Sequence, residues 1–212
     1  MSLKVTEIFL SLQGESRTSG LPTVFVRLTG CPLRCRWCDT AYAFHGGERM
    51  ALETILDEVK AFAVKHVTVT GGEPLAQPEC LSLLTALADQ GFEVSLETSG
   101  ALDVSEVDSR VVKIIDLKPP GSGEEAKNRF ENLDHLSGKD QIKFVIGNRE
   151  DYLWSKGILA QYQLPSRCEI LFSPVAGEQN PRQLAEWILE DRLPVRFQLQ
   201  LHKLLWGDEP GR

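Results

Sequence analysis

The sequence lacks any apolar run that approaches the roughly 20 residues needed for a membrane-spanning helix. Its N-terminal segment has no uninterrupted apolar stretch typical of an export signal, because Glu7 interrupts it. We therefore expect a cytoplasmic protein without a membrane partner. Low-complexity segments, long linkers and sharp repeats are missing as well, so the whole chain, residues 1–212, is expected to form a single domain.

Basic residues are in deficit. The chain has 23 Lys and Arg against 30 Asp and Glu, which gives a net charge of −7 at pH 7. A nucleic-acid-binding protein normally presents a basic face. The charge balance therefore predicts no nucleic-acid partner.

Cysteine is also sparse, and its distribution is uneven. The chain has five cysteines, three of which lie within residues 31–38. An odd and clustered set does not suit a disulfide framework. It is typical of a metal or redox role in a reducing compartment.

Short β-branched runs alternate with helical stretches along the chain. The pattern predicts strands at 23–29, 66–70, 92–98, 111–117, 141–147, 168–174 and 195–201. It predicts helices near 51–64, 78–90, 124–136, 149–162 and 181–191. Repeated strand–helix units indicate an α/β fold with a parallel sheet covered by helices.

Most of the predicted strands have one apolar face and one polar face. In the first, Val24, Val26 and Leu28 share a face opposite Arg27. A doubly wound sheet is buried on both sides and would be apolar throughout. A sheet curled around a polar cavity explains the alternation better. Because a complete (β/α) barrel typically needs about 250 residues, we expect an incomplete (β/α) barrel with six or seven parallel strands, and ligands at the C-terminal strand ends.

The segment GCPLRCRWCDT, residues 30–40, follows the first predicted strand. Thiolates of Cys31, Cys35 and Cys38 can hold three irons of a [4Fe–4S] cluster and leave the fourth iron open to a ligand. A zinc site completed by His45 or Cys80 is the alternative, and the spacing alone does not separate the two.

A second motif, GGEP at 71–74, follows the strand at 66–70. Two glycines at a strand end leave backbone groups accessible to a close ligand. Glu73 adds an acceptor that could meet an ammonium group. Taken alone, this motif also suits an ordinary turn.

Together, CxxxCxxC and GGEP resemble the motifs of the radical S-adenosylmethionine (SAM) superfamily, and Trp37 matches its usual aromatic position. The resemblance implies a partial (β/α) barrel and a [4Fe–4S] cluster bound by Cys31, Cys35 and Cys38. It implies that SAM fills the open iron position, with Gly72 near its amino group. One electron from the cluster would then cleave a carbon–sulfur bond and yield a 5′-deoxyadenosyl radical.

Further segments look like those of the 7-carboxy-7-deazaguanine synthase family: SLQGES (11–16), CDT (38–40), ETSG (97–100), DLKPP (116–120) and LQLHK (199–203). This resemblance implies ring contraction of 6-carboxy-5,6,7,8-tetrahydropterin to 7-carboxy-7-deazaguanine and ammonia, in queuosine biosynthesis. The radical would take the hydrogen at carbon 6 of the pterin, and SAM would be regenerated. The family resemblance also implies a homodimer and a flavodoxin or ferredoxin as electron donor.

The same resemblance implies which residues form the site. It implies no catalytic side chain, because the reactive radical comes from the cofactor. It implies pterin contacts for Leu12, Gln13, Gly14, Arg27 and Thr70, SAM contacts for Gly72, Asp116, Leu117 and Lys118, and Mg²⁺ binding at Thr40. Many relatives have Ser-Pro-Lys where this chain has Asp-Leu-Lys, at 116–118.

Arg27 is expected to bind the carboxylate of the substrate, because an inward-facing charge needs an anion and a guanidinium suits a carboxylate. Glu97 or Asp116 is the alternative partner. Gln13 could hydrogen-bond the pterin edge. Lys143 and His202 are expected to face inward.

Two other functions share parts of this pattern. Glycyl-radical enzyme activating proteins have the CxxxCxxC spacing and a similar size, but they lack a pterin-binding loop. A non-catalytic iron–sulfur carrier or zinc module is the second alternative, although an electron carrier needs a fourth protein ligand. Cys80 and Cys168 are expected to be small buried hydrophobic residues.

Overall fold

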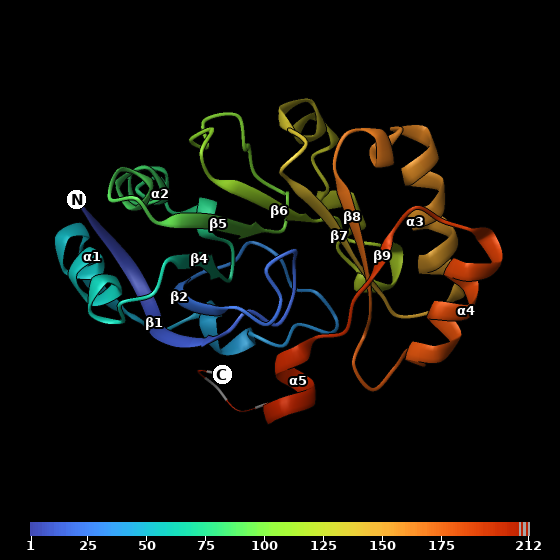
Figure 1. Cartoon of the computed structure of the whole chain (residues 1–212), viewed down its shortest axis with the longest axis horizontal. Coiled ribbons are helices and arrows are strands. Elements are labelled where there is room, and N and C mark those ends of the chain that lie inside the picture. Colours follow the sequence, from blue (N-terminus) through green and yellow to red (C-terminus); the bar gives the residue numbers. More distant parts are fainter. Residues whose placement is uncertain (208, 210, 212) are drawn as a thin grey trace.

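The computed structural model describes residues 1–207, 209 and 211. Nine strands in this part of the chain form one curved sheet in the order β3-β1-β2-β4-β5-β6-β7-β8-β9 (Figure 1). They are β1 (Ser2–Leu12), β2 (Pro22–Leu28), β3 (Glu48–Ala51), β4 (His66–Gly71), β5 (Glu93–Thr98), β6 (Val112–Asp116), β7 (Gln141–Ile146), β8 (Glu169–Pro174) and β9 (Arg196–Phe197). Strands β2 and β4 to β9 are parallel. The predicted α/β class with a largely parallel sheet is confirmed, and the curvature is compatible with an incomplete barrel.

Helices α1 to α4 lie along the outer face of the sheet (Figure 1). The described residues form α1 (Leu52–Ala61), α2 (Cys80–Asp89), α3 (Arg149–Gln161), α4 (Pro181–Asp191) and α5 (Leu201–Trp206). Short 3₁₀ helices are η1 (Ala41–Phe44), η2 (Pro74–Ala76), η3 (Pro120–Ser122), η4 (Glu125–Lys127), η5 (Phe130–His135) and η6 (Leu164–Ser166). Asn148 and Asn180 cap the starts of α3 and α4 by accepting hydrogen bonds from backbone N–H groups. Four predicted helices are thus confirmed.

The sequence analysis did not predict two of the strands, β1 and β3. β1 and β3 extend the sheet beyond β2, and both pairings are antiparallel. In β1 the register shifts between Val5 and Glu7, so the apolar alternation that identifies a strand is interrupted there. β3 is short and mostly exposed, which leaves no apolar pattern to detect.

The predicted helix at 124–136 is wrong, because this segment forms only η4 and η5. Its asparagine side chains bind other loops. The side chain of Asn128 forms two hydrogen bonds with the backbone of Lys118. The Lys118 N–H donates to the Asn128 side-chain oxygen, and the Asn128 side-chain amide donates to the Lys118 carbonyl, both at 2.8 Å. Asn132 donates to the carbonyls of Gly100 and Leu102. Such side-chain bonds compete with helix formation.

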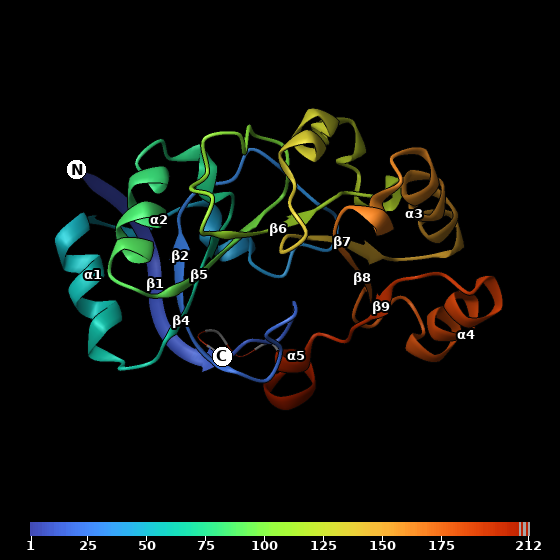
Figure 2. The same cartoon turned by 45° about the horizontal axis from the view of Figure 1, so that its top comes forward.

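The predicted strand at 195–201 is also wrong in extent, because β9 ends at Phe197 and Leu201 begins α5. Gln198 leaves the sheet to bond both backbone groups of Ser16, at 2.7 and 2.8 Å. The N–H of Leu201 donates to the Gly14 carbonyl at 2.9 Å. Figure 2 shows α5 beside the loop that follows β1. The C-terminal segment therefore packs against that loop.

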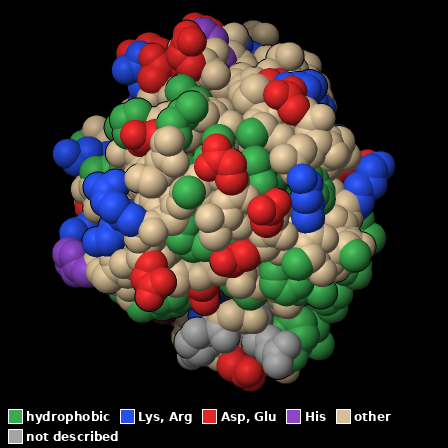
Figure 3. Space-filling view, turned by 90° about the vertical axis from the view of Figure 1, so that its left-hand side faces the viewer, with side chains coloured by type: hydrophobic (Ala, Val, Ile, Leu, Met, Phe, Trp, Pro, Cys, Tyr) green, Lys and Arg blue, Asp and Glu red, His purple; other side chains and the backbone are tan. Residues whose placement is uncertain are grey.

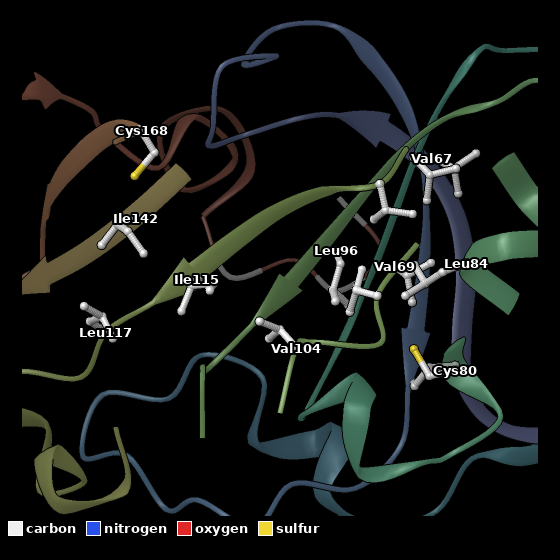
Figure 4. Packing of buried hydrophobic residues seen from close by; sticks show 14 of the residues in the cluster. Val67, Val69, Cys80, Leu84, Leu96, Val104, Ile115, Leu117, Ile142 and Cys168 are labelled. Carbon is white, nitrogen blue, oxygen red and sulfur yellow. The ribbon is translucent and has the colours of Figure 1, made fainter. Parts of the chain in front are cut away.

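The apolar core lies between the outer face of the sheet and the helices. Val69 of β4 and Leu96 of β5 pack there with Cys80 and Leu84 of α2 (Figure 4). Cys80 and Cys168 are both buried in this core, which confirms their predicted placement. The opposite faces of the same strands carry polar side chains, so the predicted alternation is confirmed as well.

The surface is mixed in charge on the face seen in Figure 3, where basic side chains stand among acidic ones and form no broad basic patch. None of the helices in the described part of the chain is long and apolar enough to cross a membrane.

Candidate active site

A cavity of about 770 Å³ lies at the polar, concave face of the sheet. Two groups of residues line it. The first, here called the cysteine half, comprises residues 31, 33, 35, 37–40, 72, 116 and 118. The second, here called the Arg27 half, comprises residues 12–15, 27, 70 and 202. With the exception of Leu117, every predicted site residue therefore lines one cavity.

The loop that carries the three predicted ligand cysteines is fastened to other loops at the same end of the sheet. The Arg34 N–H donates to the Glu124 carboxylate at 2.7 Å, and the Arg36 N–H donates to the Ser122 carbonyl at 2.9 Å. The Arg36 side chain also pairs with Glu178, in the segment between β8 and α4. These contacts hold the loop over the C-terminal strand ends, as expected for the ligand-binding end of such a sheet.

The three loop cysteines are free thiols with intermediate exposure. Burial raises the pKa of Cys31 and raises that of Cys35 to about 11, so metal binding would release their protons. Among the described residues, no three His, Cys, Asp or Glu side chains are grouped as ligands of one metal ion. Cys80, considered as a further zinc ligand, lies in the core and does not line the cavity.

Gly72 brings the end of β4 against the cysteine loop. A Cβ atom at this position would lie 2.3 Å from the Gly30 carbonyl oxygen and 2.8 Å from the Cys31 Cβ. The next N–H, of Glu73, donates to that same Gly30 carbonyl at 2.8 Å. Only glycine fits this approach without moving backbone.

Glu73 does not line the cavity, so the expectation that it meets an ammonium group there is wrong. Its carboxylate is fully buried. It accepts hydrogen bonds from the Thr98 hydroxyl at 2.8 Å and from the Ser99 N–H at 2.7 Å. Glu73 therefore links the GGEP segment (71–74) to the ETSG segment (97–100) by hydrogen bonds. Its role is to position these two segments, which border the cavity.

Residues 116–118 contribute in different ways. The Lys118 ammonium pairs with one Asp116 oxygen, Oδ2, at 3.2 Å. The other oxygen, Oδ1, is buried and has no hydrogen-bond partner among the described residues. An unsatisfied buried acceptor is costly, so this atom suits a hydrogen-bond donor on a ligand. Leu117 points into the core, so only its backbone can face a ligand.

The three thiols, Gly72 and Asp116 fit the [4Fe–4S] cluster and SAM that the motifs imply. Three thiols on one loop suit three irons of a cluster. The close contact between Gly72 and the cysteine loop, and the unpartnered Oδ1 of Asp116, suit a small polar molecule beside the cluster. Thr40 lies next to this set, with its hydroxyl 3.8 Å from the Cys38 sulfur.

In the Arg27 half, the side chain of Gln13 is already satisfied by the protein. Its amide donates to Thr68 at 3.1 Å and to Glu97 at 3.2 Å, and its oxygen accepts from the Glu15 N–H at 3.1 Å. The Thr70 hydroxyl donates to the other Glu97 oxygen at 3.3 Å. Gln13 therefore orders the floor of the cavity, in addition to lining it.

Arg27 projects from β2 into the cavity, but its partner is neither Glu97 nor Asp116, and that alternative is wrong. Its Nε donates to Glu7 of β1 at 2.6 Å, and Tyr42 donates to the same Glu7 oxygen at 2.8 Å. The guanidinium also lies 5.7 Å from the centre of the Phe9 ring. This fixes the guanidinium in an aromatic setting in which its terminal nitrogens can meet an anion.

Comparison with known proteins decides the family. A model of the Radical SAM superfamily matches residues 25–119. A 7-carboxy-7-deazaguanine synthase of Chlorobaculum tepidum is 47% identical over 210 residues, which cover 98% of this chain and 96% of the relative. This chain belongs to the 7-carboxy-7-deazaguanine synthase family. Another relative of that name, from Koribacter versatilis, is 43% identical and covers 98% of both chains.

Structural similarity extends to the whole fold of this family. The crystal structure of QueE from Escherichia coli matches 95% of each chain with a TM-score of 0.78, at 24% sequence identity. Membership in the 7-carboxy-7-deazaguanine synthase family confirms the predicted family. It also implies a [4Fe–4S] cluster and SAM as cofactors and a pterin as substrate.

Some residues at the cavity were not predicted as site residues from the sequence. Glu15 bonds Lys143 and the Gln200 amide at the cavity floor, although only its motif was noted. Glu7 could not be found, because β1 was not predicted. His202 does face the cavity, as predicted, and burial lowers its pKa. A Cβ on Gly14 would lie 2.2 Å from its Nδ1.

Proposed function

We propose that this chain is a radical SAM enzyme of queuosine biosynthesis that contracts 6-carboxy-5,6,7,8-tetrahydropterin to 7-carboxy-7-deazaguanine with release of ammonia. The observation that carries this proposal is the 47% identity to a 7-carboxy-7-deazaguanine synthase over almost the full length of both chains. The cavity supports it, because one space joins the three-cysteine loop to a fixed guanidinium.

In this proposal the cysteine half holds the cofactors. Cys31, Cys35 and Cys38 would ligate the cluster and leave one iron open to SAM. When bound, cluster and SAM supply one-electron cleavage of a carbon–sulfur bond and a radical that abstracts hydrogen. The protein positions SAM through the backbone at Gly72 and Leu117, the free oxygen of Asp116, and Lys118.

The Arg27 half holds the pterin. Arg27 binds the carboxylate, supported by its inward position and its fixed Nε. Leu12 and Gly14 contribute packing and backbone, Gln13 and Thr70 form the polar floor, and the cavity walls exclude water from the radical. No side chain is required as a further catalytic group.

Several finer assignments belong to the same proposal. Thr40 would contribute one oxygen to Mg²⁺, an ion that commonly keeps waters and takes further ligands from its substrate. The electron donor is a flavodoxin or ferredoxin, and the enzyme is a cytoplasmic homodimer whose 212 residues form one domain. It needs neither nucleic acid nor a membrane.

The test is an anaerobic reaction with reconstituted enzyme, reductant, SAM, Mg²⁺ and carboxytetrahydropterin. We expect the deazapurine product and ammonia in equal amounts. Cleavage of SAM without any dependence on the pterin would instead favour a glycyl-radical enzyme activating protein. A cluster that never reacts with SAM would favour a non-catalytic module.

A further inference from the structure

Lys143 lies between the two halves of the cavity. It projects from the inner face of β7 and is 8% exposed. Its ammonium pairs with Glu15, in the loop after β1, and with Asp116, at the end of β6, where the nitrogen–oxygen distance is 3.2 Å. One buried cation therefore contacts one carboxylate from each half.

The ammonium of Lys143 stabilises the charged form of Glu15. Burial by itself would raise the pKa of Glu15, but Lys143 and Gln200 lower it to about 2. Nearby Glu15, Asp116 and Glu97 raise the pKa of Lys143 despite its burial. Removing one partner of a buried ion pair leaves an uncompensated charge, so the three groups form one unit.

Each carboxylate is also tied to a ligand-binding segment. Glu15 follows Gln13 and Gly14, and its second oxygen accepts from the Gln200 amide at 2.7 Å. Asp116 lines the cavity and pairs with Lys118, and its buried Oδ1 has no hydrogen-bond partner among the described residues. A ligand that orders either carboxylate therefore also orders the ammonium that holds the other one.

We propose that Lys143 is a positioning residue that couples the pterin and SAM sites, so that binding of either molecule tightens binding of the other. The inference rests on the proposed function, because it takes the ligands from there. The physical basis is that the first ligand restricts the Glu15–Lys143–Asp116 unit, so the protein loses less conformational freedom when the second ligand binds. Linkage requires the effect to be equal in both directions.

The experiment uses unreduced holoenzyme with its cluster, so that both ligands bind without reacting. Carboxytetrahydropterin is titrated by anaerobic calorimetry with and without saturating SAM, and SAM with and without the pterin. We expect each ligand to tighten the other about tenfold, within the usual range for coupled sites. In Lys143→Met the factor should fall below about twofold, and Lys143→Arg should recover part of it because the charge is kept.

Lys113→Met is the matched control. Lys113 is a second buried lysine of the same sheet, paired with Asp140 at 3.1 Å, but it does not line the cavity. This variant should lose stability and keep the full coupling. A merely structural role of Lys143 would give the same pattern in both variants.

Glu15→Gln and Asp116→Asn test the same unit if Lys143→Met does not fold. Each keeps the side-chain shape. Glu15→Gln removes the ion pair with Lys143, and Asp116→Asn removes the ion pairs with both Lys143 and Lys118, so each should reduce the coupling. Unchanged coupling in Lys143→Met or in both of these variants would overturn the inference. Failure of the unaltered holoenzyme to bind the pterin at all would instead contradict the proposed function, and the inference with it.

Discussion

The two halves of the cavity differ in how their polar atoms are satisfied. In the cysteine half, the three thiols form no disulfide, and Asp116 Oδ1 lacks a hydrogen-bond partner among the described residues. In the Arg27 half, Gln13 and Glu15 bond to other protein groups, and so does the Nε of Arg27. The first half leaves a ligand position open, whereas the polar side chains of the second half already bond to protein groups.

The difference has a topological origin. The thiols come from one loop of eight residues, Cys31 to Cys38, so a short motif carries their geometry. The Arg27 half is assembled from distant segments, as in the bonds that join Ser16 to Gln198 and Glu15 to Gln200. We therefore expect substitutions in the cysteine half to abolish chemistry, and those in the Arg27 half to change affinity or stability by degrees.

The largest effect is expected for Cys35→Ala. Two thiolates cannot hold three irons, so this variant should lose the cluster and all cleavage of SAM. Iron and sulfide analysis and the visible absorbance of the cluster measure the loss. Cys168→Ala, in the core, should keep the cluster, and an intact cluster in Cys35→Ala would contradict the assignment.

Gly72→Ala tests the close approach of GGEP to the cysteine loop. The new Cβ would overlap the Gly30 carbonyl, which must move. A displacement of about 1 Å near the reacting atoms costs about 100-fold in rate. SAM cleavage in the reduced enzyme is the measurement. Gly157→Ala in α3 has open space around its Cβ and should retain the rate; equal rates in both variants would refute the role of the approach.

Arg27→Ala should weaken pterin binding while the cluster and SAM cleavage persist. Loss of one partner of a buried charged contact costs about 2 kcal/mol or more, which corresponds to a roughly 30-fold higher KM. Steady-state kinetics measure this change. Arg182→Ala removes a guanidinium that is 88% exposed on α4 and should have no effect. An unaltered KM in Arg27→Ala would exclude the carboxylate role.

The smallest effect on activity is expected for Gln198→Ala. The substitution leaves the buried backbone groups of Ser16 without their side-chain partner, which costs about 1–3 kcal/mol of folding stability. Chemical denaturation should detect it, with activity changed by less than about threefold at low temperature. Gln161→Ala, on the exposed end of α3, should leave stability within about 0.5 kcal/mol. If Gln198→Ala is equally stable, the contact does not order the loop.

The sequence was sufficient for the parts of the molecule that depend on local patterns. Alternation identified the inner faces of β2 and β4 to β7, and the spacing of the cysteines predicted a metal-binding loop at the cavity. Long-range contacts were not predictable in this way. The bulge near Val5 hid β1, and with it Glu7, the partner of Arg27. Asn132 and Gln198 bond to distant backbone, which overrides the helical and strand patterns around them.

The central claim is that the three thiols hold a cluster whose fourth iron is reserved for SAM. The most direct test is the electron paramagnetic resonance spectrum of the reduced, reconstituted enzyme before and after SAM is added. We predict a clear change in the spectrum on addition, because a new ligand binds the cluster iron. An identical spectrum at saturating SAM, or a preparation whose metal is zinc, would contradict the account.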